Sequence, residues 1–219
     1  SGPQTPDKKG SYYTYYNSDD HSVTPVPAFP SDERLPMAAT ETPVCDFGAS
    51  ASDFSLPDTR GKTWTLADCR GENGTLVMFI CNHCPFVKAV LDRIVRDARE
   101  LDALGVRCVA IMSNDPAQYP EDSPEQMARI AQQHDFPFPY LIDATQQVAK
   151  AYGAVCTPDF FGYNADLDLQ YRGRLDASRV EPAPPDTRRE LFESMSAIAK
   201  TGHGPAEQVA SIGCSIKWR

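Results

Sequence analysis

The sequence predicts an α/β fold in which helices flank a mixed β-sheet. Apolar runs at 75–80 and 106–112 have the composition and length of buried strands, and a segment with helical spacing follows each of them. Two strand-like segments at 159–163 and 169–174 come later, around a turn, and a final helix follows. Because strands and helices alternate, right-handed crossovers should place helices on both faces of the sheet.

An N-terminal β-hairpin is expected before the first buried strand. The segments 53–56 and 62–66 alternate apolar and polar residues, and a turn containing proline and glycine joins them. A strand at 138–142 and a helix at 143–153 form an inserted strand–helix unit before Thr157. The remaining helices are expected at 83–104, 123–134 and 187–200.

Local signals mark the ends of these helices. Ser123 before Pro124 is typical of a helix start, and Asp143 and Thr187 stand in equivalent capping positions. Glycine often ends a helix because it adopts a left-handed backbone conformation without steric penalty. The glycines expected in this role are Gly105, Gly153 and Gly202.

The composition is that of one globular domain with additions. The chain has 219 residues, of which 41% are hydrophobic and 23% charged, and its net charge is −9. An acidic surface disfavours nucleic acid and anionic membranes as partners. No apolar stretch approaches the roughly 18 residues that span a bilayer, and no signal peptide is evident. We therefore expect a cytoplasmic protein without membrane or nucleic-acid partners.

Residues 1–43 differ from the rest of the chain. They are rich in Pro, Ser, Asp and Tyr and have no helical or strand period. We interpret them as a flexible tail or a remnant added in cloning, with Met37 as a candidate native start. Residues 44–219 are expected to form a single domain, and the apolar C-terminal segment 212–218 is expected to dock on it.

The most informative motif is the Cys-x-x-Cys formed by Cys81 and Cys84, which Pro85 follows. It falls on the turn from the strand at 75–80 into the next helix. Backbone N–H groups and the helix dipole at such a turn favour a thiolate over a thiol. Two cysteines one helical turn apart can form and open a disulfide, which is the chemistry of thiol–disulfide exchange.

The residues of the motif have distinct expected roles. Cys81 should be the nucleophile, near the N-cap and more exposed than Cys84, which lies one turn inside the helix and resolves the mixed disulfide. A cationic His83 would stabilise the Cys81 thiolate and make the disulfide a stronger oxidant. The alternative is a solvated His83 with little effect.

A metal site is the alternative function for the same motif. Cys81, His83 and Cys84 offer soft ligands for copper or zinc, and Cys156 could extend the set. Zinc usually takes four ligands, and the sequence has no second close ligand pair. Redox chemistry without a resident metal is therefore favoured.

The order of elements, the Cys-x-x-Cys turn and the later Thr157-Pro158 resemble the thioredoxin superfamily over residues 47–201. The segments 81–88 and 212–218 resemble those of a peroxiredoxin-like, AhpC/TSA-related group of bacterial proteins with this fold. The resemblance implies a cis peptide bond before Pro158, in a loop that faces the first cysteine and holds the substrate chain. The alternative is an ordinary trans proline at a strand start.

Two features depart from the patterns of related families. Ile80 stands where thioredoxins have a tryptophan before the first cysteine. Peroxiredoxins have Thr or Ser three residues before the peroxidatic cysteine and Pro seven residues before it. Counted from Cys84, these places hold Cys81 and Val77. The pattern that activates peroxide is therefore absent, which argues against direct peroxidase activity.

The other cysteines have several interpretations. Cys156 directly precedes the Thr-Pro step and could be a third redox thiol, although a small buried residue is favoured. Cys214 is either a packed residue of the C-terminal segment or a remote resolving thiol. Cys69 and Cys108 are expected in or near the core, and Cys45 at the edge of the N-terminal tail.

These observations predict a thiol–disulfide oxidoreductase that needs no bound organic cofactor. It would exchange its Cys81–Cys84 dithiol or disulfide with a protein or a small-molecule disulfide or thiol. A reductant such as a thioredoxin or glutathione system would supply electrons. The alternatives are a peroxiredoxin-like, antioxidant thiol peroxidase and a copper- or zinc-binding protein of the same fold.

Overall fold

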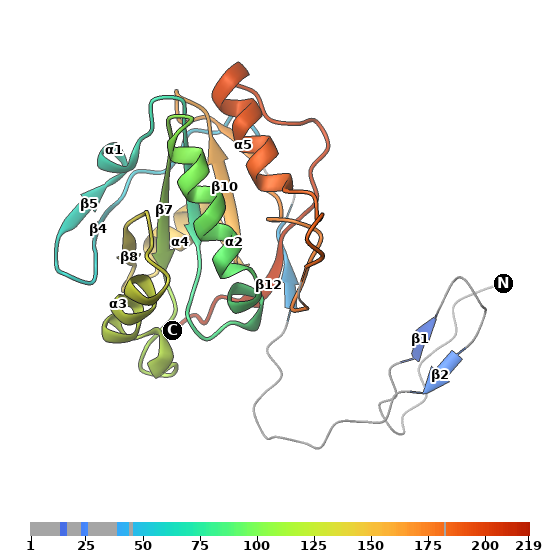
Figure 1. The fold of residues 1–219 in the computed structure, drawn as a ribbon. Helices are drawn as coiled ribbons and strands as arrows, with labels where there is room; N and C mark the ends of the chain where they lie inside the picture. The colour runs from blue at the N-terminus through green and yellow to red at the C-terminus, as the bar shows by residue number, and fades with distance from the viewer. Residues whose placement is uncertain (1–13, 17–22, 26–38, 44–45, 182) are drawn as a thin grey trace. The chain divides into compact units, whose positions relative to one another are not determined.

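The protein divides into two units, residues 1–36 and residues 37–219. A computed structural model describes residues 14–16, 23–25, 39–43, 46–181 and 183–219 (Figure 1). In the first unit, β1 (Thr14–Tyr16) pairs antiparallel with β2 (Val23–Pro25), although no strand period is evident in the sequence there. The expected flexible tail and Cys45 lie largely outside the described residues. No helix of the described residues is long and apolar enough to cross a membrane.

A five-stranded mixed sheet forms the centre of the second unit, with the strand order β11-β10-β6-β7-β8. Strands β6, β7 and β8 are parallel, whereas β10 runs antiparallel to β6, and β11 runs antiparallel to β10. Strand β6 is buried throughout, as its apolar run predicts. The bounds are β6 Gly74–Phe79, β7 Val106–Met112, β8 Tyr140–Ile142, β10 Asp159–Tyr163 and β11 Leu169–Tyr171.

Both faces of this sheet are covered, as the alternation of elements predicts. Successive side chains of a strand point to opposite faces of the sheet. Met78 therefore packs with α2 and α5, whereas Phe79 packs with α4 and the β4–β5 hairpin. In Figure 1, α2 and α5 lie in front of the sheet and α4 lies behind it. The bounds are β4 Ser55–Pro57, β5 Thr63–Thr65, α1 Leu66–Cys69, α2 Pro85–Asp102, α3 Pro124–Gln133, α4 Gln147–Tyr152 and α5 Glu190–Thr201.

A separate three-stranded sheet joins the two ends of the second unit. Strand β12 (Ile212–Ser215) pairs antiparallel with β3 (Ala39–Glu41) on one side and with β9 (Cys156–Thr157) on the other. The docking predicted for the C-terminal segment is therefore confirmed. Because β3 belongs to this sheet, the compact unit begins before residue 44, where the sequence analysis places the boundary.

Helix α2 begins later than expected, and the reason is local. Proline suits the first helical position and favours an extended conformation in the residue before it. Pro85 is accordingly the first residue of α2, and Cys84 is the N-cap with φ −69° and ψ 123°. The prediction that Cys84 lies one turn inside the helix is wrong.

Two other helix starts also differ from prediction. Gln146, in a left-handed conformation, precedes α4, because the buried carboxylate of Asp143 instead holds the loop by accepting hydrogen bonds from Ser113 and the Ala149 N–H. Arg189 rather than the expected threonine precedes α5. The helix start at Ser123 and the helix ends at Gly153 and Gly202 are confirmed.

Candidate functional site

The turn between β6 and α2 holds the two cysteines of the Cys-x-x-Cys motif. The Cys81 sulfur lies 3.3 Å from the Thr157 hydroxyl oxygen, and the Cys84 sulfur lies 3.1 Å from the Thr157 carbonyl oxygen. The Thr157–Pro158 peptide bond is cis, as the resemblance implies. The loop after β9 thus meets both sulfurs of the motif, although 73 residues separate Thr157 from Cys84.

Both cysteine side chains are buried in this arrangement. Cys81 is 1% exposed and Cys84 0%, so the expected difference in exposure is negligible. Cys81 nevertheless lines a pocket of about 200 Å³ at the junction of α2 and α3. Apolar side chains dominate its wall, among them Val87, Leu91, Ile130 and Phe136. A small reagent that enters this pocket meets Cys81.

A third sulfur lies against the motif. Cys214, in β12, is 1% exposed, and its sulfur lies 2.6 Å from the Cys84 sulfur. Antiparallel pairing places Cys214 directly opposite Thr157, which explains how a residue near the C-terminus reaches the site. The sequence analysis interprets Cys214 either as a remote resolving thiol or as a packed residue. This geometry is compatible with both interpretations.

The lowered thiol pKa in this cluster belongs to Cys84, whereas the sequence analysis assigns the thiolate to Cys81. Hydrogen bonds from the Cys214 and Cys81 thiols lower the pKa of Cys84 far below its usual value. Burial, with a contribution from Asp122, raises the pKa of Cys81. The hydrogen bond to Cys84, together with burial, raises the pKa of Cys214. The Thr157 carbonyl favours the protonated form of Cys84. Cys84 nevertheless has the lowest pKa of the three thiols Cys81, Cys84 and Cys214.

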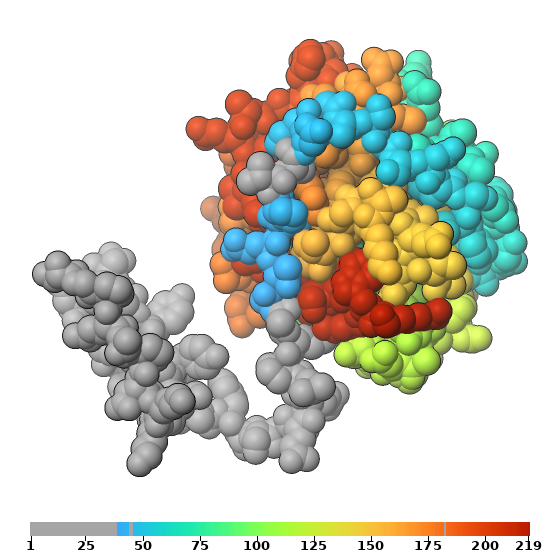
Figure 2. Space-filling view, turned by 180° about the vertical axis from the view of Figure 1, so that it is seen from behind, coloured from blue at the N-terminus to red at the C-terminus, as the bar shows by residue number. Residues whose placement is uncertain are grey.

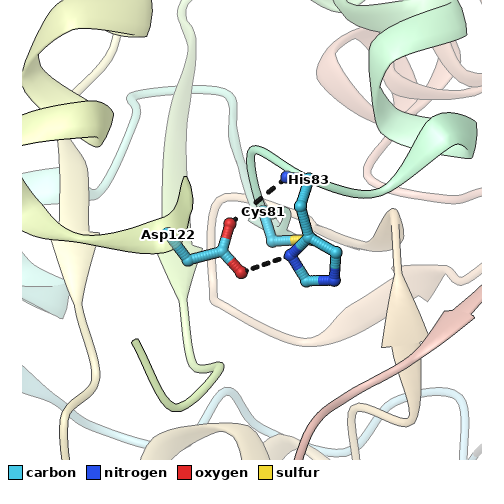
Figure 3. A group of neighbouring side chains, drawn as sticks. All are labelled: Cys81, His83 and Asp122. Carbon is cyan, nitrogen blue, oxygen red and sulfur yellow. Dashed lines mark hydrogen bonds and ion pairs between the residues drawn. The ribbon is translucent and has the colours of Figure 1, made fainter. Parts of the chain in front are cut away.

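His83 forms a carboxylate–imidazole pair with Asp122, which the sequence analysis did not identify. The Nδ1 atom lies 2.6 Å from an Asp122 oxygen, with both side chains buried. The Cys81 sulfur, a His83 ring nitrogen and an Asp122 oxygen all lie within 4.8 Å of one another (Figure 3). Among the described residues, the buried Nε2 atom has no hydrogen-bond partner. The carboxylate therefore orients the ring and leaves Nε2 available as a base.

Asp122 belongs to a short 3-10 helix, η1 (Pro120–Asp122), and is fully buried. Its carboxylate accepts hydrogen bonds from the backbone N–H groups of Asn82 and His83, at 2.7 and 3.3 Å, and from the Asn114 side chain at 3.0 Å. These bonds tie η1 to the Cys-x-x-Cys turn. The sequence analysis placed this segment in a loop, where an aspartate has no periodic signal to distinguish it.

An aromatic ring covers the imidazole. Tyr119 stacks on His83, with ring centroids 4.5 Å apart and an interplanar angle of 12°. His83 is therefore not the solvated residue of the alternative interpretation, because the stacked ring and the Asp122 carboxylate leave its side chain only 5% exposed.

Cys156 neighbours Thr157 in β9 but its side chain has different surroundings. Its sulfur lies 3.5 Å from the Pro158 carbonyl oxygen, and burial raises its pKa. Adjacent residues of a strand point to opposite sides, so Thr157 faces the motif while Cys156 does not. Cys69 and Cys108 are buried in the core as predicted, and burial raises the pKa of Cys69 to about 11.

The structure brings together a different set of candidate metal ligands from the one that the sequence suggests. Cys84 lies with Cys214, and Cys156 faces away, so the donors that gather are Cys81, His83 and Asp122. Three donors of this kind are one short of the four that structural zinc usually takes. Both Asp122 oxygens are also already engaged, one by the imidazole and the other by backbone N–H groups.

Comparisons with known proteins agree with the fold. A crystal structure of an uncharacterized conserved protein from Geobacillus kaustophilus is 46% identical, with a TM-score of 0.80, over 84% of this chain and 98% of that one. A hypothetical protein from Sinorhizobium meliloti 1021 is 39% identical, with a TM-score of 0.79, over 82% and 98%. A putative thiol:disulfide interchange protein from Chlorobium tepidum shares the fold at 20% identity, with a TM-score of 0.52, over 71% and 99%. No curated protein matches the chain.

Fold and site together define a thioredoxin-fold protein of the thiol–disulfide oxidoreductase or peroxiredoxin type. A model described as the AhpC/TSA family matches residues 47–175, which is more than half of the sequence. The chain belongs to the AhpC/TSA family.

Proposed function

We propose that this protein is a thiol–disulfide oxidoreductase that uses the Cys81–Cys84 pair. The observation that supports the proposal best is the placement of both sulfurs against the cis-proline loop, at 3.3 and 3.1 Å from atoms of Thr157. Cys81 faces the small apolar pocket and Cys84 lies behind it at the helix N-terminus. This order suits attack by Cys81 and resolution by Cys84.

The proposed reaction has two steps. The Cys81 thiolate attacks a substrate disulfide, one substrate thiolate leaves, and a mixed disulfide forms. The Cys84 thiolate then attacks the Cys81 sulfur, which releases the second substrate thiolate and leaves a Cys81–Cys84 disulfide. The lowered pKa of Cys84 supports this assignment, since the resolving residue is already ionised when the mixed disulfide forms.

His83 and Asp122 have a proton-transfer role in the proposed reaction. Because the pKa of Cys81 is raised, this thiol must lose its proton before it attacks. The Asp122 carboxylate holds Nδ1–H, so the Nε2 atom is the basic nitrogen. Because Nε2 makes no hydrogen bond to the Cys81 thiol, the imidazole accepts the Cys81 proton through one bridging water, and Asp122 stabilises the cation that forms.

The substrate class is a disulfide or thiol, either small or carried on an extended peptide. A small substrate would enter the pocket beside Cys81, whereas a peptide would approach Pro158, which lines a second pocket of about 200 Å³ together with Phe86. A thioredoxin or glutathione system is the proposed reductant, and no bound organic cofactor is required. A reducing, cytoplasm-like compartment is the proposed location, since only the Cys81–Cys84 pair has close spacing and the cysteines are too sparse for a secreted disulfide scaffold.

The test is disulfide reduction by the full chain with dithiothreitol as electron source and insulin as substrate. Cys81→Ser should reduce the rate to background, because the nucleophile is lost. Cys84→Ser should still attack but accumulate mixed disulfides, because the second thiol is needed for release. Cys108→Ala, which removes a buried thiol remote from the motif, is the matched control. Near-normal activity of Cys81→Ser would overturn the proposal.

A peroxide-reducing activity is the second candidate, and membership of the AhpC/TSA family favours it. The pocket beside Cys81 has room for a peroxide, although the threonine and proline of the peroxiredoxin pattern are replaced by Cys81 and Val77. Peroxide consumption with a defined reductant separates this activity from disulfide exchange. Measurement of zinc and copper in the purified protein tests the metal-binding alternative.

A further inference from the structure

The C-terminal strand packs directly against the redox motif. Strand β12 pairs with β9 so that Cys214 lies opposite Thr157, and its other edge pairs with β3. Figure 2 shows the C-terminal residues, in dark red, on the surface beside the gold segment that contains α4. Inside this strand, the Cys214 side chain points away from solvent toward Cys84, with a sulfur–sulfur distance of 2.6 Å.

Residues on either side of Cys214 allow β12 to pack closely against β9 and hold it there. At Gly213 an added Cβ would lie 2.1 Å from the Thr157 carbonyl oxygen, so only glycine allows the strand to come so close. The Ser211 hydroxyl donates a hydrogen bond to the Pro158 carbonyl at 2.8 Å. The Lys217 N–H donates to the Asn114 side chain, also at 2.8 Å. The strand is therefore anchored on both sides of Cys214.

The sulfur contact is specific to Cys214. A disulfide has a length of about 2.05 Å, so the Cys84 and Cys214 sulfurs are already close to bonding distance. Cys156, in the paired strand, is equally buried but its sulfur contacts the Pro158 carbonyl. The Cys84 sulfur thus has two sulfur neighbours, which are Cys81 in the same turn and Cys214 in strand β12.

We propose that Cys214 is a third redox thiol, which forms a buried disulfide with Cys84 and releases Cys81 from the Cys81–Cys84 disulfide. The inference rests on the proposed function and extends it from a two-cysteine to a three-cysteine site. It gives the C-terminal strand a chemical role in addition to its structural one.

The step is an internal exchange that needs no external oxidant. The Cys214 sulfur attacks the Cys84 sulfur, the Cys84–Cys214 bond forms, the Cys81–Cys84 bond breaks, and the electron pair leaves on Cys81. The proton of the Cys214 thiol passes to the Cys81 sulfur, so charge and protons balance. A reducing dithiol must later convert the Cys84–Cys214 disulfide back to two thiols, and becomes a disulfide itself.

The exchange has a consequence for the pocket. After it, Cys81 is a free thiol again beside the apolar pocket, while the oxidised pair lies behind it under β12. The site can therefore hold a disulfide without blocking its nucleophile. The raised pKa of Cys214 agrees with a thiol that stays protonated until Cys84 becomes oxidised.

Disulfide mapping of the full chain tests the proposal. Trypsin releases Cys81 and Cys84 together in residues 71–88 and Cys214 in residues 201–217. A Cys81–Cys84 disulfide is then a loop within one peptide, whereas Cys84–Cys214 joins two peptides. The reduced protein is oxidised with one equivalent of diamide, which takes up the two electrons and two protons of a thiol pair. It is then quenched with acid and N-ethylmaleimide and digested.

The decisive variant is Cys81→Ser, in which the loop cannot form. We expect the joined peptides to be its major oxidised product and a substantial product of the wild type. Cys156→Ser is the matched control and should leave both products unchanged. Absence of the joined peptides from both the wild type and Cys81→Ser would overturn the inference.

The proposed function has its own readout in the same experiment. Insulin reduction by the wild type needs only Cys81 and Cys84, whereas the joined peptides also need Cys214. If the loop and the activity persist while the joined peptides are never found, the two-cysteine function stands and the third thiol is refuted. If the wild type forms neither product and reduces no insulin, the proposed function fails.

Discussion

Only two residues separate Cys81 from Cys84 in the same turn, yet the two thiols differ in their neighbouring pockets, hydrogen-bond partners and charge. On the Cys81 side are an apolar pocket and the His83–Asp122 pair, which can carry a proton. On the Cys84 side are a second sulfur and a carbonyl oxygen, under the C-terminal strand. The difference teaches that the two thiols are not equivalent. Cys81 borders a pocket, whereas the lowered pKa places the negative charge on Cys84.

The largest effect is expected on the Cys81 side. Asp122→Asn keeps the size of the side chain but removes its charge, so the His83 tautomer and orientation are no longer held. Disulfide exchange should fall about a hundredfold, the order of general acid–base contributions. The matched control is Asp92→Asn, since the exposed Asp92 pairs with His134 in a second carboxylate–imidazole pair.

The pH dependence separates a catalytic from a merely structural role for Asp122. Because the Asp122 charge contributes to the raised pKa of Cys81, the pH profile of Cys81 alkylation should shift to lower pH in the variant. If the rate falls but the pH profile does not shift, Asp122 acts only through stability and the comparison of the two sides is weakened.

A substitution at Gly213 addresses the Cys84 side. Gly213→Ala would force β12 away from the Thr157 carbonyl, and overpacking of this kind costs about 1–3 kcal/mol. We expect a lower melting temperature and faster alkylation of Cys84, measured by mass spectrometry of timed iodoacetamide reactions. Gly61→Ala is the control for a loss of stability away from β12, because φ at Gly61 is +81° and alanine is strained there although the space around it is open. Unchanged alkylation of Cys84 would show that β12 does not cover it.

The charge difference between the sulfurs is testable by titration of the reduced protein. Thiolate absorbance near 240 nm should persist below pH 7 in the wild type and disappear in Cys84→Ser. Cys214→Ser should raise the apparent pKa of Cys84, because the hydrogen bond from Cys214 is the largest cause of its lowering. A wild type without thiolate at pH 7 would contradict the assignment.

The directions of these pKa shifts determine how the free energy of unfolding changes with pH. An unfolded cysteine has a pKa of about 8.5. The lowered pKa of Cys84 contributes stability above that pH, which is lost as the pH falls toward the folded-state value. The raised pKa values of Cys81 and Cys214 contribute stability below about pH 8.5, which is lost as the pH rises. Urea unfolding of the reduced wild type and Cys84→Ser between pH 6 and 10 measures the difference.

The smallest effect is expected from the N-terminal residues, and two deletions distinguish their parts. Removal of residues 1–36, a separate unit, should leave the melting temperature and thiol exchange nearly unchanged. Extending the deletion through residue 43 removes β3 and the Thr42 N–H bond to the Ser211 carbonyl. Each kcal/mol lost there lowers the melting temperature by about 2–4 °C. Equal melting temperatures would show that β3 does not support β12.

Periodic apolar segments are the part of the fold that the sequence predicts well. The hairpin at β4 and β5, the buried strands β6 and β7, and the helices α2, α3 and α5 follow from runs and spacings within each segment. Short elements were missed because two to four residues carry no period. Examples are β3, β9 and the helix α1. The starts of α2 and α4 were misplaced because boundaries depend on single residues such as Pro85 and Gln146.

Some residues of the candidate site could likewise be predicted from the sequence, and others could not. Cys81, Cys84, His83 and Pro158 were identifiable because the motif and the Thr-Pro step are local patterns. Asp122 has no such pattern, since it comes from a loop 39 residues after His83 and meets it only in the folded chain.

By itself, the sequence determined the class of chemistry: two thiols on a strand-to-helix turn and a proline loop to face them, each encoded within a few consecutive residues. Only the tertiary structure decided how the thiols differ. The lowered pKa of Cys84 depends on Cys214, 130 residues away, and the orientation of the His83 ring depends on Asp122. Hydrogen bonds and sulfur contacts act over about 3 Å, so they exist only once strand pairing has brought distant segments together.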